Sequence, residues 1–224
     1  MMGGMARIRE WREEEAESIW DEVRAVLLAG GLAALPTETF YALSAHPFRE
    51  EALARLLALK ARPSRKPILL LVSDRDMVRQ LAREIPEAAA RLMARFWPGP
   101  LTIILPARPE LSPGLTGGTG TVGVRQPAQA VICRLLQALG FPVTGTSANR
   151  SGAPPLTRAR EVAGEFGEAL DLVLDAGPCP GGKPSTVVDV SRTPARLVRA
   201  GAVPATALAE VLPELKALTT EKDA

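Results

Sequence analysis

The sequence is poor in the residues from which most metal and nucleophilic sites are built. Its 224 residues include one histidine, two cysteines and one tyrosine, and aromatic residues make up only 4%. A single histidine excludes a multi-histidine metal centre, and two distant cysteines argue against a structural zinc site. So few cysteines fit a reducing cytoplasm. The scarcity of aromatics argues against a surface that stacks single-stranded nucleic acid.

Long apolar runs and a large net charge are also missing. No segment is long and apolar enough to span a bilayer, and residues 1–7 carry no apolar signal core. The formal net charge is only +2, so contact with nucleic acid would have to come from a local patch. With 46% hydrophobic residues the chain can bury a substantial core. We expect a folded, cytoplasmic protein without a membrane partner.

Acidic residues are absent from one stretch that is rich in cations. No Asp or Glu occurs within 56–73, whereas this stretch contains Lys60, Arg62, Arg65 and Lys66. An apolar run, 68–72, follows at once. Cations on an exposed loop that leads into a buried strand are suited to bind an anion such as phosphate at a sheet edge. A basic loop that only aids solubility is the alternative interpretation.

Three further segments place hydroxyl residues, glycine or proline directly after a short apolar run. They are 32–41, 142–152 and 181–189. Small hydroxyl residues beside glycine let backbone N–H groups approach an oxygen-rich ligand, and their O–H groups add donors. Each segment alone is better explained by an ordinary turn or a helix N-cap. Together with the basic stretch they predict one shared polar site.

Predicted strands alternate with predicted helices along most of the chain. We expect helices over 12–29, 49–60, 74–83, 86–96, 128–139, 158–166 and 204–217, and strands over 32–35, 68–72, 101–105, 121–125, 142–144, 171–174, 185–190 and 196–199. This order is typical of an α/β fold. We predict a twisted, open mixed sheet, largely parallel, flanked by helices. Residues 106–120, rich in Pro, Gly and Thr, should form a loop.

No linker divides the chain. We therefore expect one domain over residues 10–205, followed by a C-terminal helix and a frayed tail over 206–224.

Seven short blocks follow one another in the order of a known family. They are Pro36-Thr-Glu-Thr-Phe-Tyr41, Lys60-x-Arg62-x-x-x-Lys66-Pro67, Trp97-Pro-Gly-Pro-Leu-Thr102, Val122-Gly-Val-Arg125-x-Pro127, Thr146-Ser-Ala-Asn149-x-Ser-Gly152, Pro184-Ser-Thr-Val-Val-Asp189 and Val198-Arg-Ala-Gly201. With them the chain resembles the YrdC-like family of threonylcarbamoyl-AMP synthases over about residues 17–203. Ala42 stands where the family usually has glycine. No added C-terminal domain follows the matched core, so the resemblance is to the short, single-domain form.

The resemblance implies a nucleotidyltransferase with a basic concave cleft. It would make threonylcarbamoyl-AMP and pyrophosphate from L-threonine, bicarbonate and ATP, for the N6-threonylcarbamoyl modification of adenosine 37 in tRNA. Mg²⁺ would be carried in by ATP and not held in a protein cage. The downstream partners would be the proteins that transfer the threonylcarbamoyl group to tRNA, and weak direct binding of tRNA stays open. The alternative is a paralogue of the same fold that binds a nucleotide or RNA without synthase activity.

The resemblance also assigns roles to single residues. Lys60 and Arg62 would be the catalytic cations at the phosphates and bicarbonate. Thr37, Arg125 and Ser185 would hold threonine, whereas the ATP side would be lined by Lys66, Thr121, Ser147, Asn149 and Arg199. The residue types agree, because anionic substrates need positioned cations and donors and no covalent nucleophile. Two alternatives stay open: Arg199 could pair with Asp175 or Asp189, and Asn149 could be only a turn residue. Tyr41 is expected to pack at the cleft wall.

Overall fold

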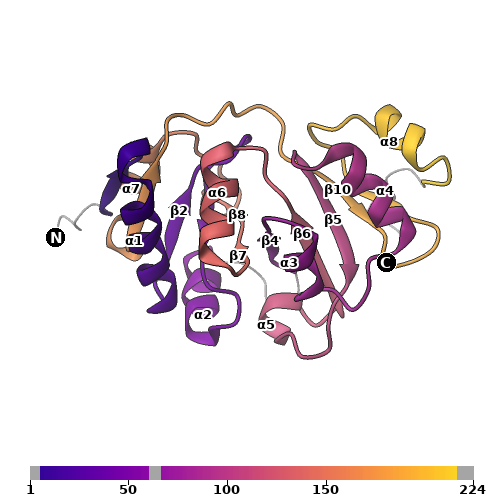
Figure 1. Cartoon of the computed structure of the whole chain (residues 1–224), viewed down its shortest axis with the longest axis horizontal. Coiled ribbons are helices and arrows are strands. Elements are labelled where there is room, and N and C mark those ends of the chain that lie inside the picture. The colour runs from indigo at the N-terminus through magenta and orange to yellow at the C-terminus, as the bar shows by residue number, and fades with distance from the viewer. Residues whose placement is uncertain (1–5, 61–66, 216–224) are drawn as a thin grey trace.

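Two mixed β-sheets form the centre of the molecule (Figure 1). The computed structural model describes residues 6–60 and 67–215. Its strands are β1 (Ile8–Glu10), β2 (Ala33–Leu35), β3 (Ala42–Ser44), β4 (Leu69–Leu71), β5 (Leu101–Pro106), β6 (Thr121–Arg125), β7 (Val143–Thr144), β8 (Thr146–Ser147), β9 (Leu172–Asp175), β10 (Thr186–Asp189) and β11 (Arg196–Arg199). One sheet has the order β1-β9-β2-β3-β8, and the other has the order β11-β10-β5-β6-β4-β7.

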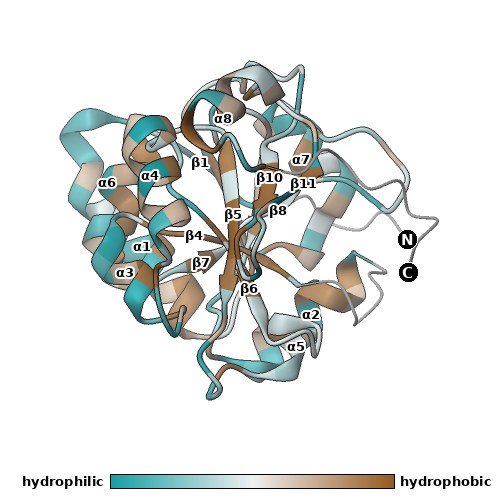
Figure 2. Ribbon diagram, turned by 90° about the vertical axis from the view of Figure 1, so that its right-hand side faces the viewer, coloured by the Kyte–Doolittle hydropathy of each residue, from teal (hydrophilic) through white to brown (hydrophobic). Residues whose placement is uncertain are grey.

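Helices cover the strands on both sides. They are α1 (Ala16–Leu28), α2 (Glu50–Leu59), α3 (Arg75–Arg79), α4 (Glu87–Phe96), α5 (Pro113–Thr116), α6 (Ala130–Leu139), α7 (Ala159–Phe166) and α8 (Ala205–Val211), with short 3₁₀ turns at Glu13–Glu15 and Gly167–Ala169. Figure 2 shows α1, α3, α4 and α6 on one side of the strands and α2, α5 and α7 on the other. Many of the most hydrophobic residues lie in the strands between these two groups of helices.

The pleat of the strands distributes their side chains between two hydrophobic clusters. In β9, Leu172 and Leu174 pack in the cluster that α1 and α6 complete, whereas Val173 belongs to the larger cluster that includes α7. Successive side chains of a strand point to opposite faces, so a strand covered on both faces is apolar throughout. The stripe of α1 that faces this sheet is fully buried and consists of Ile19, Val23 and Leu27.

The α/β class, the mixed pairing and the flanking helices are confirmed, but the sheet itself differs from the expectation. In place of one largely parallel sheet there are two sheets, and antiparallel pairs such as β2–β3, β4–β7 and β5–β6 slightly outnumber the parallel ones, five to four among the described strands. The reason lies in the segments that connect the strands. The segment between β2 and β3 contains no helix, and without a long crossover the chain can only return antiparallel.

Most differences in the elements concern short pieces. Strands β1, β3 and β8 were not predicted, since two or three residues are too few to show a period. The helix expected over 74–83 covers only Arg75–Arg79, and the expected loop over 106–120 contains the helical turn α5.

The C-terminal helix belongs to the same core as the rest of the fold. Leu208 of α8 and Leu212 just after it are both fully buried in the larger cluster. A domain over 10–205 with a separate tail over 206–224 stays a prediction, because residues 216–224 lie outside the described part. Within residues 6–60 and 67–215, no helix is both long and apolar enough to cross a bilayer.

Candidate functional site

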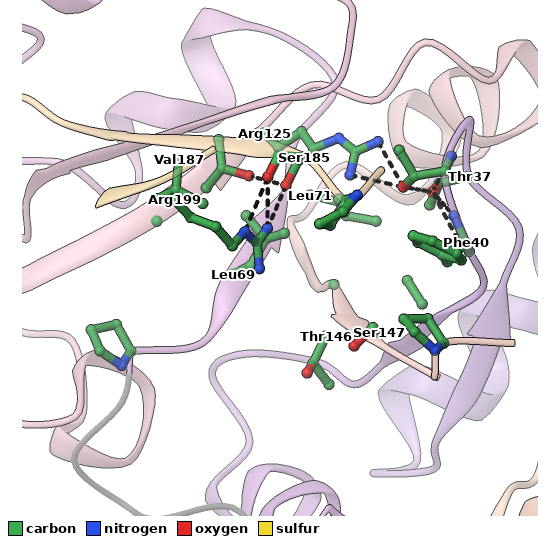
Figure 3. Close-up of a pocket in the computed structure, with 18 of the residues that line it drawn as sticks. Thr37, Phe40, Leu69, Leu71, Arg125, Thr146, Ser147, Ser185, Val187 and Arg199 are labelled. Carbon is green, nitrogen blue, oxygen red and sulfur yellow. Dashed lines mark hydrogen bonds between the residues drawn. The ribbon is translucent and has the colours of Figure 1, made fainter. Parts of the chain in front are cut away.

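A cleft of about 680 Å³ opens where the two sheets come together (Figure 3). The first sheet contributes the β2–β3 turn and β8, and the second contributes β4, β5, β6, β11, β10 and the segment just before β10. Its polar lining consists of Thr37, Thr39, Thr102, Arg125, Thr146, Ser147, Ser185 and Arg199, and its apolar lining includes Leu69, Leu71, Ile104, Val187 and Val198. Apolar walls with a few convergent donors suit a ligand that combines a ring with several oxygens.

The structure brings together most of the residues expected at the site. Those that line the cleft are Thr37, Arg125, Ser147, Ser185 and Arg199. Thr121 does not line it: its hydroxyl lies 2.8 Å from that of Thr119, although Gly123 on the same strand does line the cleft. Arg62 and Lys66 lie outside the described residues.

Lys60 is a buried cation that holds the end of β8. Its ammonium group donates to the carbonyl oxygen of Ser147 at 2.7 Å and to the carbonyl oxygen of Asn149 at 2.5 Å. A third bond, 2.8 Å long, reaches the Asn149 amide oxygen. Lys60 is only 7% exposed, which corrects the expectation of an exposed charge at the start of a basic loop. A buried ammonium needs such oxygen partners, and here they order the segment 147–149.

The side chain of Asn149 orders the turn that follows β8. Its amide oxygen accepts a bond from the Ser147 hydroxyl at 2.7 Å, and its amide nitrogen donates to the Ala153 carbonyl at 2.6 Å. Asn149 is not among the residues that line the cleft. These contacts favour the alternative interpretation, in which Asn149 is a turn residue that positions Ser147.

Gly145 lets the chain pass from one sheet to the other beside the cleft. Val143–Thr144 pairs with β4 of the second sheet, and Thr146–Ser147 pairs with β3 of the first. The N–H group of Gly145 donates to the Leu69 carbonyl at 2.7 Å, and a Cβ atom on Gly145 would lie 2.7 Å from Cγ of Leu71. A residue without a side chain is therefore needed at this crossing.

Arg125 links the two sheets at one end of the cleft. Both terminal nitrogens donate to the Thr39 hydroxyl at 3.3 Å, and Nε donates to the Gly99 carbonyl at 3.3 Å. One terminal nitrogen also lies 2.6 Å from a carboxylate oxygen of Glu38. The turn that carries these partners is folded by Thr37, whose hydroxyl accepts from the backbone N–H groups of residues 39 and 40. The guanidinium group is thus fixed before any ligand arrives.

Arg199 and Ser185 form a second polar group in the cleft. The guanidinium donates to the Ser185 carbonyl at 2.8 and 3.1 Å and to its hydroxyl at 3.0 Å, and Figure 3 shows the two side chains adjacent. The Ser185 hydroxyl lies 2.9 Å from that of Thr102. Asp189, one of the alternative partners considered for Arg199, forms an ion pair with Arg192 at 3.1 Å. The donors of β5, of β11 and of the residue just before β10 therefore converge.

Glycine at position 201 makes this convergence possible. A Cβ atom there would lie 2.3 Å from the Pro184 carbonyl oxygen and 2.5 Å from the carbonyl carbon of Ser185. Any side chain would push the backbone that carries Ser185 away from the end of β11. The glycine of the block Val198-Arg-Ala-Gly201 is explained by this close approach of two backbones.

Sequence reasoning did not single out Thr102, Thr146 or Glu38. Thr102 and Ile104 both line the cleft, as residues two apart on one strand should, so the period of β5 was a usable signal. Glu38 stands between the cleft-lining Thr37 and Thr39 but does not line the cleft itself. An acid was not expected in a site for anions, and only the tertiary contact with Arg125 reveals it.

Within residues 6–60 and 67–215, the thiol of Cys179 and the phenol of Tyr41 near the cleft are poor nucleophiles. Burial raises the pKa of the Cys179 thiol to about 11, so it stays protonated at neutral pH. Burial, and then the charge of Asp175, raise the pKa of Tyr41 far above its ordinary value. The Tyr41 hydroxyl lies 3.3 Å from the Gly177 carbonyl, and its fully buried ring lies at the cleft wall. This agrees with a packing role for Tyr41.

Comparison with known proteins identifies relatives that match nearly the whole chain. The Sua5/YciO/YrdC family model, described as "Telomere recombination", matches residues 25–201. The threonylcarbamoyl-AMP synthase of Pyrococcus abyssi is 37% identical over 210 residues, which are 94% of this chain and 60% of the relative. The threonylcarbamoyl-AMP synthase of Bacillus subtilis is 36% identical over 183 residues, 81% of this chain and 53% of the relative. The chain thus spans 60% and 53% of the lengths of these two proteins.

The fold has a solved counterpart in the same family. The crystal structure of P. abyssi Sua5 complexed with L-threonine superposes with a TM-score of 0.88 at 35% identity, covering 95% of this chain and 62% of that one. The shared blocks, the matched model and this superposition agree. The chain belongs to the Sua5/YciO/YrdC family.

Proposed function

We propose that this protein is a threonylcarbamoyl-AMP synthase. In the proposed reaction the amino group of L-threonine and bicarbonate give a carbamate and water. A carbamate oxygen then attacks the α-phosphorus of ATP, and pyrophosphate leaves. The product would supply the threonylcarbamoyl group for adenosine 37 of tRNAs that read codons beginning with A. The synthases of P. abyssi and B. subtilis, and the L-threonine complex of P. abyssi Sua5, support this choice of substrates.

The observation that carries the proposal is the meeting of two donor groups in one cleft. Arg125 with Thr39 lies in one group and Arg199 with Ser185 in the other, and both open onto the same 680 Å³. Joining anionic substrates requires that their mutual repulsion be offset and their reacting atoms be held together. Two fixed guanidinium groups, several hydroxyls and an apolar wall meet this requirement.

The proposed roles place the two substrates side by side. Thr37, Arg125 and Ser185 would hold threonine, and Ser147 and Arg199 would lie on the ATP side. Ser185 and Arg199 are hydrogen-bonded to each other, so the two subsites touch where the carbamate must reach the α-phosphorus. For the remaining ATP-side residues, Lys66, Thr121 and Asn149, the role stays a prediction.

The catalytic cations are a separate part of the proposal. Arg62 would face the phosphates and bicarbonate from the segment that follows α2. Lys60 would act in part through Ser147, whose carbonyl it binds at 2.7 Å. Mg²⁺ would enter on the phosphates of ATP, since phosphate oxygens are its usual ligands in such sites.

The test is pyrophosphate release by the purified protein. We expect release from ATP only when L-threonine and bicarbonate are both present, and much less when either is omitted. Arg125→Gln should abolish the threonine-dependent release. Arg134→Gln, which removes an arginine of α6 remote from the cleft, should behave as the wild type. Equal release without threonine would contradict the synthase, and binding of ATP without any release would favour the non-catalytic paralogue.

A further inference from the structure

Glu38 is buried behind Arg125 and depends on it for compensation of its charge. Its side chain is 17% exposed, that of Arg125 is 5% exposed, and the two approach to 2.6 Å. Both carboxylate oxygens are inaccessible to solvent, and within the described chain neither accepts a well-oriented hydrogen bond. Buried carboxylates are usually compensated by several donors. Here the ion pair with Arg125 takes that place.

This pairing changes what Arg125 can bind. Arg125 lines the cleft, so a ligand there can reach its guanidinium, but the negative charge of Glu38 offsets the positive charge that the ligand would feel. An oxyanion bound to Arg125 would feel the carboxylate behind it, and Coulomb repulsion rises in proportion to the charge of the anion. A carboxylate carries one negative charge, and in an amino acid an ammonium group balances it. A phosphate group with two charges is disfavoured more strongly.

Such discrimination matters because the two kinds of anion share one cleft. An arginine without an acidic partner binds phosphate readily, often through two parallel hydrogen bonds. The inference rests on the proposed function, in which the triphosphate of ATP and the released pyrophosphate lie next to the amino acid. If phosphate occupied Arg125, it would exclude the amino acid carboxylate.

We propose that Glu38 is a specificity-determining residue that reserves Arg125 for a carboxylate and keeps phosphate groups out of the amino-acid subsite. It acts through Arg125 and not on the ligand, because Thr37 and Thr39 on either side of it line the cleft and Glu38 does not. A purely structural ion pair between the two sheets would change only the free energy of unfolding. If Glu38 sets selectivity, its loss also changes how strongly phosphate competes with a carboxylate for Arg125.

The variant that separates these roles is Glu38→Gln. Glutamine has nearly the same shape, and its amide oxygen can still accept a bond from Arg125, so charge is lost while geometry is kept. The measurement is the calorimetric affinity for L-threonine at about pH 8, with and without inorganic phosphate. Only phosphate that excludes L-threonine from its subsite competes in this assay. Glu165→Gln, which removes the exposed partner of Arg150, is the matched control.

In the wild type and in Glu165→Gln we expect phosphate to compete weakly with L-threonine. In Glu38→Gln the affinity of phosphate as a competitor should rise at least tenfold, about 1.4 kcal/mol, and more than the affinity for threonine. Unchanged competition in a folded Glu38→Gln protein overturns the inference, even if that protein unfolds more easily. If Glu38→Gln does not fold, the titration of the wild type still tests the inference, because strong competition by phosphate in the wild type would overturn it.

The same titrations distinguish failure of this inference from failure of the proposed function. If L-threonine binds the wild type, and Arg125→Gln abolishes this binding, the amino-acid subsite stands whatever phosphate does. If L-threonine does not bind even without phosphate, the proposed function fails and the inference fails with it.

Discussion

The ammonium group of Lys60 lies 2.8 Å from the amide oxygen of Asn149, and the same group binds the backbone carbonyls of Ser147 and Asn149. The end of α2 is thereby tied to the end of β8. The segment with Arg62 and Lys66 starts directly after this tie. The position of Ser147 in the cleft thus depends on a residue 87 positions earlier in the chain.

Lys60→Met should reduce both stability and activity. Methionine keeps the apolar stem but removes one donor from each of three oxygens. The Asn149 amide oxygen keeps its bond from the Ser147 hydroxyl, and the Ser147 carbonyl keeps its bond from the Asn149 N–H group, so the loss is largest at the Asn149 carbonyl. An unsatisfied buried group costs about 1–3 kcal/mol. We expect the free energy of unfolding in urea to fall by at least about 1 kcal/mol, and pyrophosphate release to fall as Ser147 moves. Arg55→Met, on the exposed face of the same helix, is the control. Full activity in Lys60→Met would show that Lys60 has no role in the function of the site.

Arg62→Ala should reduce activity strongly and stability only slightly. If Arg62 contacts the reacting phosphates, the loss of a transition-state contact costs about 3 kcal/mol, roughly a hundredfold in rate. Substitution of an exposed charge changes stability by only about 0.5 kcal/mol. Steady-state pyrophosphate release and urea unfolding measure the two quantities. An Arg62→Ala protein with normal turnover would show that the basic segment is a surface feature.

Amino-acid selectivity should follow the hydroxyl more than the methyl group. Serine lacks one methyl of threonine, a difference worth about 1–3 kcal/mol in a small apolar contact, so it should be a poor but detectable substrate. Valine keeps the shape but would leave a hydrogen-bonding group of the site unpaired, so it should be rejected more strongly. The measurement is kcat/KM for the three amino acids at fixed ATP and bicarbonate. If kcat/KM for valine equalled that for serine, the site would not recognise the hydroxyl group of the substrate.

Gly201→Ala should impair the site from outside the cleft. The added methyl would lie 2.3 Å from the Pro184 carbonyl oxygen, so the backbone carrying Ser185 must move. We expect a lower free energy of unfolding and a raised KM for L-threonine. Gly164→Ala in α7 is the matched control, because a methyl there meets nothing within 4 Å. That variant should be as active as the wild type and more stable by up to about 1 kcal/mol. A normal KM in Gly201→Ala would show that the backbone around Ser185 can accommodate the added methyl group without disturbing the site.

His46 should make stability pH-dependent just below neutrality. Burial, and then the nearby charge of Arg49, lower its pKa in the folded protein below the ordinary 6.5. Its ring packs 4.5 Å from that of Phe141. As the pH falls from about 7.5 to 5, the unfolded chain takes up the proton first, so stability is lost over this range. His46→Gln removes the only imidazole, and urea unfolding should then vary less with pH between these limits. An unchanged slope would contradict the lowered pKa.

Much of the site was predictable because its residues follow strands whose apolar runs are visible in the sequence. Thr37 follows β2, Ser147 ends β8 and Ser185 precedes β10, and Arg125 and Arg199 end two other strands. The strands must be buried, so their polar neighbours meet at the strand ends, where a cleft can form. The α/β class follows from the same alternation of apolar runs.

What the sequence could not reveal depends on contacts between distant segments. Arg125 meets Thr39 across 86 positions, and Lys60 meets Asn149 across 89. The burial of Lys60, the pairing of Glu38 with Arg125 and the crossing at Gly145 arise only when two sheets pack against each other. Such contacts have no period along the chain. The sequence by itself determined which residues stand at the strand ends, and only the tertiary structure decided which of them touch, because the packing of the two sheets sets those distances.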